Sequence, residues 1–216
     1  MQAAEIEDRF RRIYPIKRTL DYLIGIPLLI LSLPIMGILG VLIKIIDPGP
    51  VFYVQDRVGY RGRKFKIIKM RTMYINADKA LDEYLNENDK AKEEWESYLK
   101  LKEDPRILPI IGKFMRRNSL DELPQFWNII KGDMTLVGPR PFPTYHLEKF
   151  SPEFRALRQS FMPGLTGFWQ VYARSNGDLK VQQEMDTHYI QNWSLLMDIR
   201  ILIRTVWTVL SRNGAY

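Results

Sequence analysis

The feature that most constrains this chain is a run of 22 residues, Tyr22 to Ile43, without a charged side chain. As a straight helix this run would be about 33 Å long, which just matches the roughly 30 Å hydrocarbon core of a bilayer. Pro27 and Pro34 interrupt the run, and Pro34 lies near its middle, where proline removes a backbone hydrogen bond and kinks a helix. The run therefore predicts a membrane helix with a bend near Ser32 and Pro34.

Basic residues flank this run on both sides: Arg9, Arg11, Arg12, Lys17 and Arg18 precede it, and Lys44, Arg57, Arg61, Arg63, Lys64 and Lys66 follow it. A spanning helix would carry one of these clusters across the membrane, against the positive-inside tendency. A re-entrant helical hairpin, bent near Ser32 to Pro34, keeps both clusters on the cytoplasmic face of the bacterial inner membrane. We favour that path over a single-pass anchor, with a soluble core helix as the third alternative.

Composition narrows the class of protein further. The 216 residues are 46% hydrophobic and 26% charged, which excludes a disordered chain and a polytopic membrane protein. The net charge of +7 suggests phosphate-bearing partners such as nucleotides, nucleic acid or an anionic membrane. Residues 76–104 are acidic, so the positive charge lies in the flanking segments. Because there is no cysteine, disulfide scaffolds and thiolate chemistry are excluded.

The remaining patterns predict an α+β fold, mainly helical with short strands, an N-terminal re-entrant membrane helix and interfacial amphipathic helices. We divide it into an N-terminal amphipathic and membrane segment, 1–46, and a cytoplasmic domain, 47–216. The apolar stripe of the last helix suits either a core or a lipid interface, with Trp193 and Trp207 beside it. The other expected elements are a turn at 47–50, a hairpin over 51–70, charged helix over 77–102, a short amphipathic helix over 107–117 and a short strand near 135–137.

Two adjacent carboxylates, Asp121 and Glu122, follow a pair of arginines that begins at Arg116. Ser119 and Glu122 fit the S-x-x-E capping box, in which the glutamate satisfies a free backbone N–H at the start of a helix. If the helix begins instead at Pro124, where proline is favoured, both carboxylates lie outside it and are available for chemistry. Local spacing alone leans towards the cap.

Two proline- and glycine-rich segments follow the acidic pair. In Gly138-Pro139-Arg140-Pro141 an arginine is held between two prolines, and such rigid presentation favours gripping a phosphate; the alternative is a solvated turn. Pro163-Gly164-Leu165-Thr166-Gly167 forms a glycine-punctuated turn, and Arg174 follows shortly after it.

Together these motifs resemble the bacterial sugar transferase family, the monotopic phosphoglycosyl transferases. The resemblance rests on Ser119-Leu120-Asp121-Glu122-Leu123-Pro124-Gln125, Lys131-Gly132-Asp133-Met134 and the two segments just described, and it covers nearly the whole chain. The stretch 167–171 and the ending Asn213-Gly214-Ala215-Tyr216 are most similar to members that act as undecaprenyl-phosphate galactose phosphotransferases. By this likeness the chain corresponds to the catalytic domain of the larger members, without the transmembrane helices in front of it.

The resemblance implies transfer of a hexose 1-phosphate from a UDP-hexose to undecaprenyl phosphate, releasing UMP, as the first membrane step of exopolysaccharide or O-antigen assembly. Asp121 would be the nucleophile that forms a covalent phosphosugar intermediate, and Glu122 would assist. Both would hold the required Mg²⁺. Phosphate or substrate binding would fall to four basic residues, Lys69, Arg116, Arg140 and Arg174. Galactose is the favoured sugar and glucose the next.

Two positions depart from the family pattern. Many relatives have Ser-Pro at the membrane kink, whereas here Leu33 separates Ser32 from Pro34; relatives also often carry a basic residue where Met162 stands. The alternative to an enzyme is a membrane-surface module that binds anionic lipid. Nucleic acid is not expected as a partner, because no recognised nucleic-acid motif occurs, and a homodimer is left open.

Overall fold

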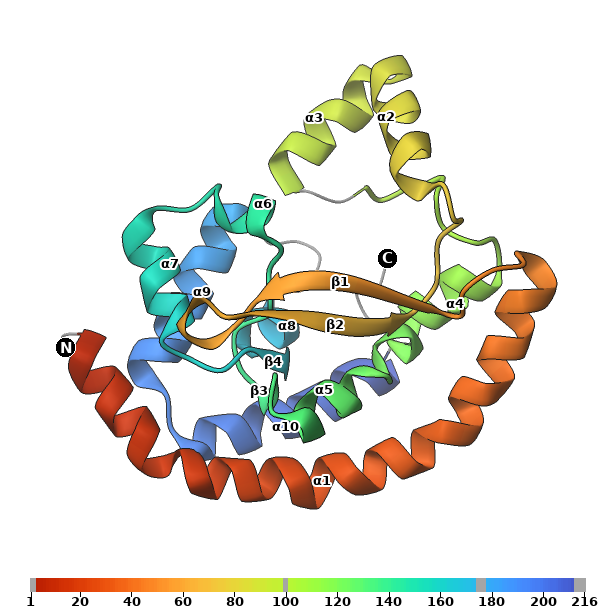
Figure 1. Cartoon of the computed structure of the whole chain (residues 1–216). Coiled ribbons are helices and arrows are strands. Elements are labelled where there is room, and N and C mark those ends of the chain that lie inside the picture. Colours follow the sequence, from red (N-terminus) through yellow and green to blue (C-terminus); the bar gives the residue numbers. More distant parts are fainter. Residues whose placement is uncertain (1–2, 99–100, 174–177, 212–216) are drawn as a thin grey trace.

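The N-terminal helix α1, Ala3–Ile46, curves around one side of the molecule (Figure 1). The computed structural model describes residues 3–98, 101–173 and 178–211, without the side chains of 3–7, 9, 11, 210 and 211. The buried positions of α1 form a narrow stripe on one helix face, spaced mostly by four or seven residues: Phe10, Lys17, Asp21, Gly25, Ser32, Leu39, Gly40 and Ile43. Three of these eight are polar, whereas most apolar residues of α1 are exposed. This distribution is typical of a helix that meets lipid.

The curvature of α1 is spread along the helix instead of being concentrated at one break (Figure 1). Pro15, Pro27 and Pro34 are all exposed, so the positions at which proline removes a backbone hydrogen bond lie on the outer side of the curve, away from the body. Ser32 Oγ donates to Leu29 O at 2.7 Å. The backbone thus continues as one helix through Ser32 and Pro34, and a hairpin of two segments does not form. The re-entrant path itself stays a prediction.

The body carries two small sheets. Strands β1, Phe52–Val58, and β2, Lys64–Met70, form the expected antiparallel hairpin around the 3₁₀ turn η1, Tyr60–Gly62. Strands β3, Thr135–Val137, and β4, Gly164–Thr166, pair in parallel. The second pairing brings the Gly138–Pro141 and Pro163–Gly167 segments together, which their separation in sequence did not reveal.

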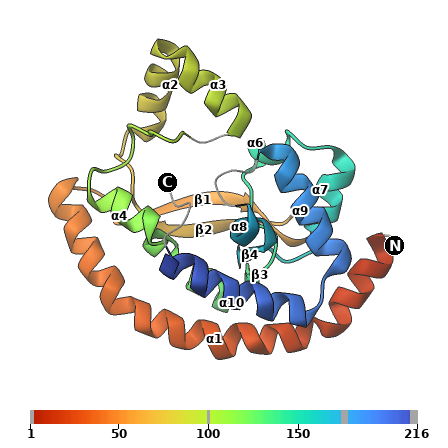
Figure 2. The same cartoon turned by 180° about the vertical axis from the view of Figure 1, so that it is seen from behind.

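Helices complete the body around these sheets. The charged region forms α2, Ala77–Glu87, and α3, Asp89–Tyr98, which stand apart from the rest at the end of the molecule opposite α1 (Figures 1 and 2). The other helices are α4, Ile111–Arg117; η2, Leu120–Glu122; α5, Gln125–Lys131; α6, Thr144–Leu147; α7, Pro152–Gln159; α8, Phe168–Tyr172; α9, Leu179–Asn192; and α10, Leu195–Ser211. The expected helix over 107–117 is therefore shorter, because Ile107 forms an isolated β-bridge with Met73 and the turn at 109–110 gives Ile110 a φ of 60°.

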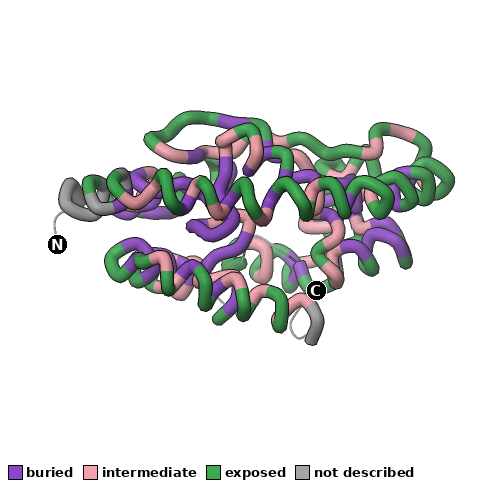
Figure 3. Tube along the Cα trace, turned by 90° about the horizontal axis from the view of Figure 1, so that it is seen from below, coloured by how far each residue is buried: buried purple, intermediate pink, exposed green. Residues whose placement is uncertain are grey.

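The main core lies where α1, α5, β3 and α10 meet, and it contains Trp193, which is 1% exposed. Trp193 is therefore a core residue and not an interfacial anchor. The predicted apolar stripe of α10 is divided: Leu195 and Leu202 pack against the core, whereas the exposed members are Leu196, Ile199, Ile203 and Val206. Trp207 is 72% exposed. Helices α1 and α10 lie at the same side of the molecule (Figures 1 and 2), and α1 is exposed along most of its length in the view from below (Figure 3). By length and composition α1 could cross a membrane.

Candidate active site

The two carboxylates lie in η2, outside the helix that follows. Helix α5 begins at Gln125 with Pro124 at its cap position, so the second of the two alternatives for the helix start is the one that forms. Ser119 has φ 56° and its side chain makes no capping bond, while its N–H donates to Arg116 O at 3.1 Å. The capping box is therefore wrong, because the backbone at Ser119 turns left-handed and its N–H already has an acceptor. Glu122 is free for another partner.

Strand β2 delivers Lys69 to these carboxylates. The buried Asn128 of α5 donates through Nδ2 to Lys66 O at 2.7 Å and accepts from Ile68 N at 3.1 Å, so its side-chain amide continues the hydrogen bonding of the strand edge. This bridge fixes the end of β2 beside η2. As a result Lys69 Nζ lies 2.8 Å from Glu122 Oε1 and 3.7 Å from Asp121 Oδ2.

Glu122 is held by two cations. Its Oε1 also accepts from Arg140 Nη2 at 2.9 Å. Burial by itself raises the pKa of Glu122, but the charges and hydrogen bonds of Lys69 and Arg140 outweigh it and bring that pKa well below its usual range. Glu122 is therefore an anion that anchors the two cations beside Asp121.

Asp121 is buried but differently placed. No hydrogen bond reaches its carboxylate from the residues that the structure describes, and its nearest cation is Lys69 at 3.7 Å. Burial raises the pKa of Asp121, the charge of Lys69 lowers it, and the neighbouring charge of Glu122 raises it. A carboxylate that is near cations but not tied up by hydrogen bonds keeps its lone pairs available to attack an electrophile.

Arg140 reaches the pair from a rigid backbone segment. Arg158, itself buried, donates through Nη2 to Arg140 O at 2.6 Å and through Nε to Asp186 Oδ2 at 2.9 Å. Gly138 packs directly on the backbone of Met162 and Gly164, where a Cβ atom would overlap. The hydrogen bond from Arg158 and the packing of Gly138 therefore fix the backbone on both sides of Arg140, which orients its side chain towards Glu122.

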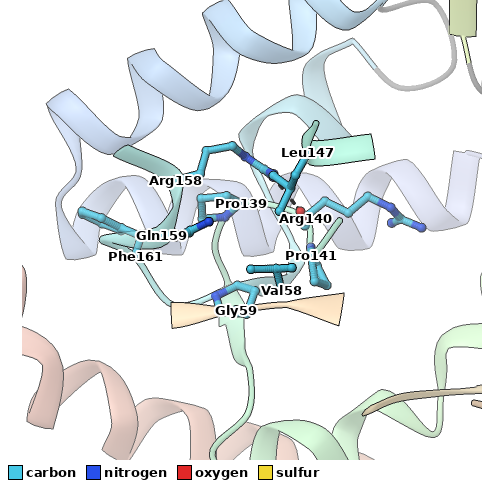
Figure 4. Close-up of a pocket in the computed structure, with 10 residues that line it drawn as sticks. Val58, Gly59, Pro139, Arg140, Pro141, Leu147, Arg158, Gln159 and Phe161 are labelled. Atoms are coloured by element: carbon cyan, nitrogen blue, oxygen red, sulfur yellow. Dashed lines mark hydrogen bonds between the residues drawn. The ribbon is translucent and has the colours of Figure 1, made fainter. Parts of the chain in front are cut away.

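A small pocket lies at the backbone end of Arg140, lined in part by Val58, Pro139, Pro141 and Phe161 (Figure 4). In the same view the Arg140 guanidinium points away from this pocket, and its Nη2 is the atom that meets Glu122. The pocket is thus part of the support behind Arg140, and the reactive groups lie at the other end of the side chain.

The structure brings together four of the predicted site residues: Asp121, Glu122, Lys69 and Arg140. Arg116 lies within electrostatic reach of Asp121, and burial lowers the pKa of its guanidinium, but its Nε donates to Thr72 Oγ1 at 3.0 Å. Arg174 and the ending 213–216 lie outside the described residues. Ser32 and Pro34 belong to α1 and contribute no side chain to the carboxylate pair.

Among the described residues no group of three or more histidine, cysteine, aspartate or glutamate side chains could hold a metal ion. The pair nevertheless suits Mg²⁺, which takes one or two carboxylates and completes its shell with water and substrate phosphate oxygens. Glu122 uses only Oε1 for Lys69 and Arg140, so Oε2 and the Asp121 carboxylate are the available protein oxygens. These donors fit a cation that arrives with its substrate.

Sequence reasoning missed two residues that build this site, Asn128 and Arg158. Asn128 has no local signal, because its partners are 60 and 62 positions away. Arg158 sits on an ordinary amphipathic helix, and only the buried Asp186 opposite it reveals that it is internal.

Comparison with known proteins identifies the family of the chain. The family model for bacterial sugar transferases matches residues 12–212. The chain is 42% identical over 200 residues to the exopolysaccharide production protein ExoY of Sinorhizobium fredii, covering 93% of this chain and 88% of that protein. It is 43% identical over 203 residues to the UDP-galactose-lipid carrier transferase of Erwinia amylovora and 42% identical over 201 residues to the undecaprenyl-phosphate galactose phosphotransferase of Salmonella typhimurium. Each match covers 93% of this chain but 42% of those two longer proteins.

Proposed function

The chain belongs to the bacterial sugar transferase family and is a transferase, and from that premise we propose that it transfers a hexose 1-phosphate from a UDP-hexose to undecaprenyl phosphate. The observation that carries this proposal is a pair of adjacent carboxylates, with Asp121 buried, among Lys69 and Arg140. Glu122 is anchored by both cations, whereas no described residue donates a hydrogen bond to Asp121. Phosphoryl transfer needs a positioned nucleophile and positive charge around the phosphate oxygens, and this cluster supplies both. A membrane-surface module would need neither.

The proposed reaction has two balanced steps. In the first, an Asp121 carboxylate oxygen forms a bond to the sugar-linked phosphorus, the bond between that phosphorus and the bridging oxygen breaks, and UMP leaves with that oxygen and its electron pair. In the second, a phosphate oxygen of undecaprenyl phosphate attacks the same phosphorus and the Asp121 carboxylate leaves. The products are UMP and undecaprenyl-diphosphate-hexose. An acyl phosphate is reactive enough to serve as the intermediate.

Each charged side chain has a part in these steps. Lys69, between the two carboxylates, lowers the pKa of Asp121 and so favours the ionised nucleophile. Arg140, anchored on Glu122, presents its remaining N–H groups to phosphate oxygens. We propose that Glu122 and Asp121 also hold Mg²⁺, which when bound would neutralise charge on the diphosphate. Arg140 and a bound Mg²⁺ would thus both supply positive charge to the diphosphate.

The proposed membrane placement follows from the surface of α1 and α10. Both helices lie at the same side of the molecule (Figures 1 and 2) and expose apolar side chains, with Ile30 60% and Ile203 67% exposed. We propose that this side lies in the inner leaflet of the cytoplasmic membrane and that α1 is re-entrant, which brings the site to the level of the lipid phosphate. Since the chain has no cysteine, single cysteines at Arg12 and Arg63 report the topology. Both should resist an impermeant thiol reagent outside intact cells; labelling of one alone would establish a spanning helix.

The reaction is tested by scoring UMP release from a panel of UDP-sugars in the presence of Mg²⁺ and undecaprenyl phosphate. We expect UDP-galactose to be used best and UDP-glucose next. Without the lipid, intact-protein mass spectrometry should show one added hexose phosphate on wild type and none on Asp121→Asn. Near wild-type turnover by Asp121→Asn would rule out the nucleophile assignment.

A further inference from the structure

Strand β1 places a second set of side chains on the face that carries Lys69. Residues that alternate along a strand share one face, so Tyr53, Gln55 and Arg57 point to the same side. The register of the hairpin pairs Tyr53 with Lys69, and directly paired residues of antiparallel strands also share a face. Because Lys69 contacts Glu122, this face of β1 continues the active site along the hairpin.

Arg57 is the unusual group on this face. Its Nη1 donates to Pro141 O at 3.2 Å and its Nη2 to Gln55 Oε1 at 2.5 Å, while Nε is buried without a hydrogen-bond partner. Among the residues that the structure describes, no carboxylate lies within ion-pair distance of Arg57. Burial, and next the charge of Arg140, lower its pKa to about 10. A guanidinium whose cationic form is disfavoured by burial and by a neighbouring guanidinium is expected where an anion binds.

Two half-exposed tyrosines lie within electrostatic reach of Arg57. Tyr53 is 47% exposed and Tyr145, the second residue of α6, is 51% exposed. Partial burial raises the pKa of Tyr53 and the charge of Arg57 lowers it, while Tyr145 acts on both groups, so the three side chains lie within electrostatic reach of one another. Exposed aromatic faces next to an unpaired cation suit a ligand that is both flat and anionic.

The geometry points to a nucleotide subsite formed by Tyr53, Arg57 and Tyr145, in which Arg57 binds the phosphate of the leaving UMP and the two rings contact its uridine. This assignment rests on the proposed function, because it divides one UDP-sugar between two neighbouring places. The sugar-linked phosphate lies at Asp121, between Lys69 and Arg140. The nucleotide phosphate lies at Arg57, four residues further along β1 than the position that pairs with Lys69, and within electrostatic reach of Arg140.

This division also separates the two substrates in space. In Figures 1 and 2 β1 lies on the side of β2 that faces away from α1, while η2 contacts β2. The nucleotide therefore enters and leaves at the end of the site remote from the apolar surface of α1. The acceptor lipid approaches Asp121 from the opposite end, so UMP can depart without crossing the lipid.

The test is direct binding of UMP and of uridine to the full chain in detergent, measured by calorimetry, with UDP-galactose binding to the inactive Asp121→Asn protein alongside. Arg57→Met should weaken UMP binding about tenfold or more and leave uridine binding unchanged, because only the phosphate contact is lost. Tyr53→Leu and Tyr145→Leu should each weaken both ligands about fivefold or more. Arg57→Lys keeps the charge but not the fork and should fall between wild type and Arg57→Met.

Matched controls are Arg63→Met and Tyr74→Leu, which remove exposed residues of the same types elsewhere and should bind UMP like wild type. Thermal unfolding of each variant identifies a folding defect, and Arg57→Lys keeps the test valid if Arg57→Met does not fold. Unchanged UMP affinity in the Arg57 and tyrosine variants would overturn the subsite and leave the proposed function intact. Failure of wild type to bind UMP, together with failure of the Asp121→Asn protein to bind UDP-galactose, would overturn the proposed function itself.

Discussion

A buried ion pair attaches the N-terminal helix to the body, and removing one partner tests how much the pair contributes to the stability of the fold. Lys17, on α1, is 3% exposed, and its Nζ lies 2.5 Å from Asp198 Oδ2 of α10 and 2.7 Å from Val137 O of β3. The other acceptor of Asp198, Oδ1, receives the Tyr189 hydroxyl at 2.7 Å and Trp193 Nε1 at 3.2 Å. The pair thus joins three elements that are far apart in sequence.

Lys17→Met keeps much of the side-chain volume and leaves Asp198 as a buried charge without its cation. Breaking a buried pair in this way costs about 3–5 kcal/mol, because the remaining charge is not solvated. A domain of this size has a free energy of unfolding of about 5–15 kcal/mol, so the loss is a large fraction of it. At about 2–4 °C per kcal/mol, the midpoint of thermal unfolding should fall by about 6–20 °C.

The measurement is thermal unfolding in detergent followed by circular dichroism. Lys79→Met is the matched control, because Lys79 is 80% exposed and pairs with Glu83 at 3.6 Å, so its loss should change stability by less than about 1 kcal/mol. Lys17→Met combined with Asp198→Asn removes the orphan charge while an amide oxygen still accepts from Tyr189, and should recover most of the lost stability. The reasoning fails if Lys17→Met unfolds within about 1 kcal/mol of wild type, or if the double variant is no more stable than the single one.

Three further predictions concern the site and the surface. Lys69→Met removes a charge that lowers the pKa of Asp121. The acidic limb of the pH profile of kcat/KM, where activity is lost as pH falls, should therefore move to higher pH. An unchanged limb would show that Lys69 does not act on the group that titrates. Gly138→Ala should destabilise the protein by about 1–3 kcal/mol in thermal unfolding, because its Cβ meets the backbone of β4, whereas Gly37→Ala on open helix surface should be neutral or stabilising by up to about 1 kcal/mol. Trp207→Asp should lower binding to anionic vesicles by about tenfold or more in a sedimentation assay, and unchanged binding would contradict an interfacial α10.

Local patterns were sufficient for several elements. The turn chemistry at 47–50 predicts the end of α1 at Ile46, and the alternation around a glycine-containing turn predicts the β1–β2 hairpin. Proline preference at a helix start gave one of two alternatives for the acidic pair, and the structure selects it. These features depend on residues within a few positions of one another, so the sequence carries them directly.

Contacts between distant segments explain what local patterns could not predict. The sequence left Glu122 open between a helix cap and a site residue, because its partner Lys69 is 53 positions away. Lys69 lies beside Glu122 because Asn128 holds β2 against α5. Lys17 looked like one more basic flank residue, yet it pairs with Asp198 181 positions away in the core.

The sequence by itself determined an apolar, proline-interrupted N-terminal helix, a hairpin, and an acidic pair next to arginines in a family of sugar transferases. Only the tertiary structure decided which carboxylate is anchored and which receives no hydrogen bond from the described residues, and which cations are buried. The physical reason is that burial and long-range pairing set the role of a charged side chain, and neither is expressed in the spacing of its neighbours along the chain.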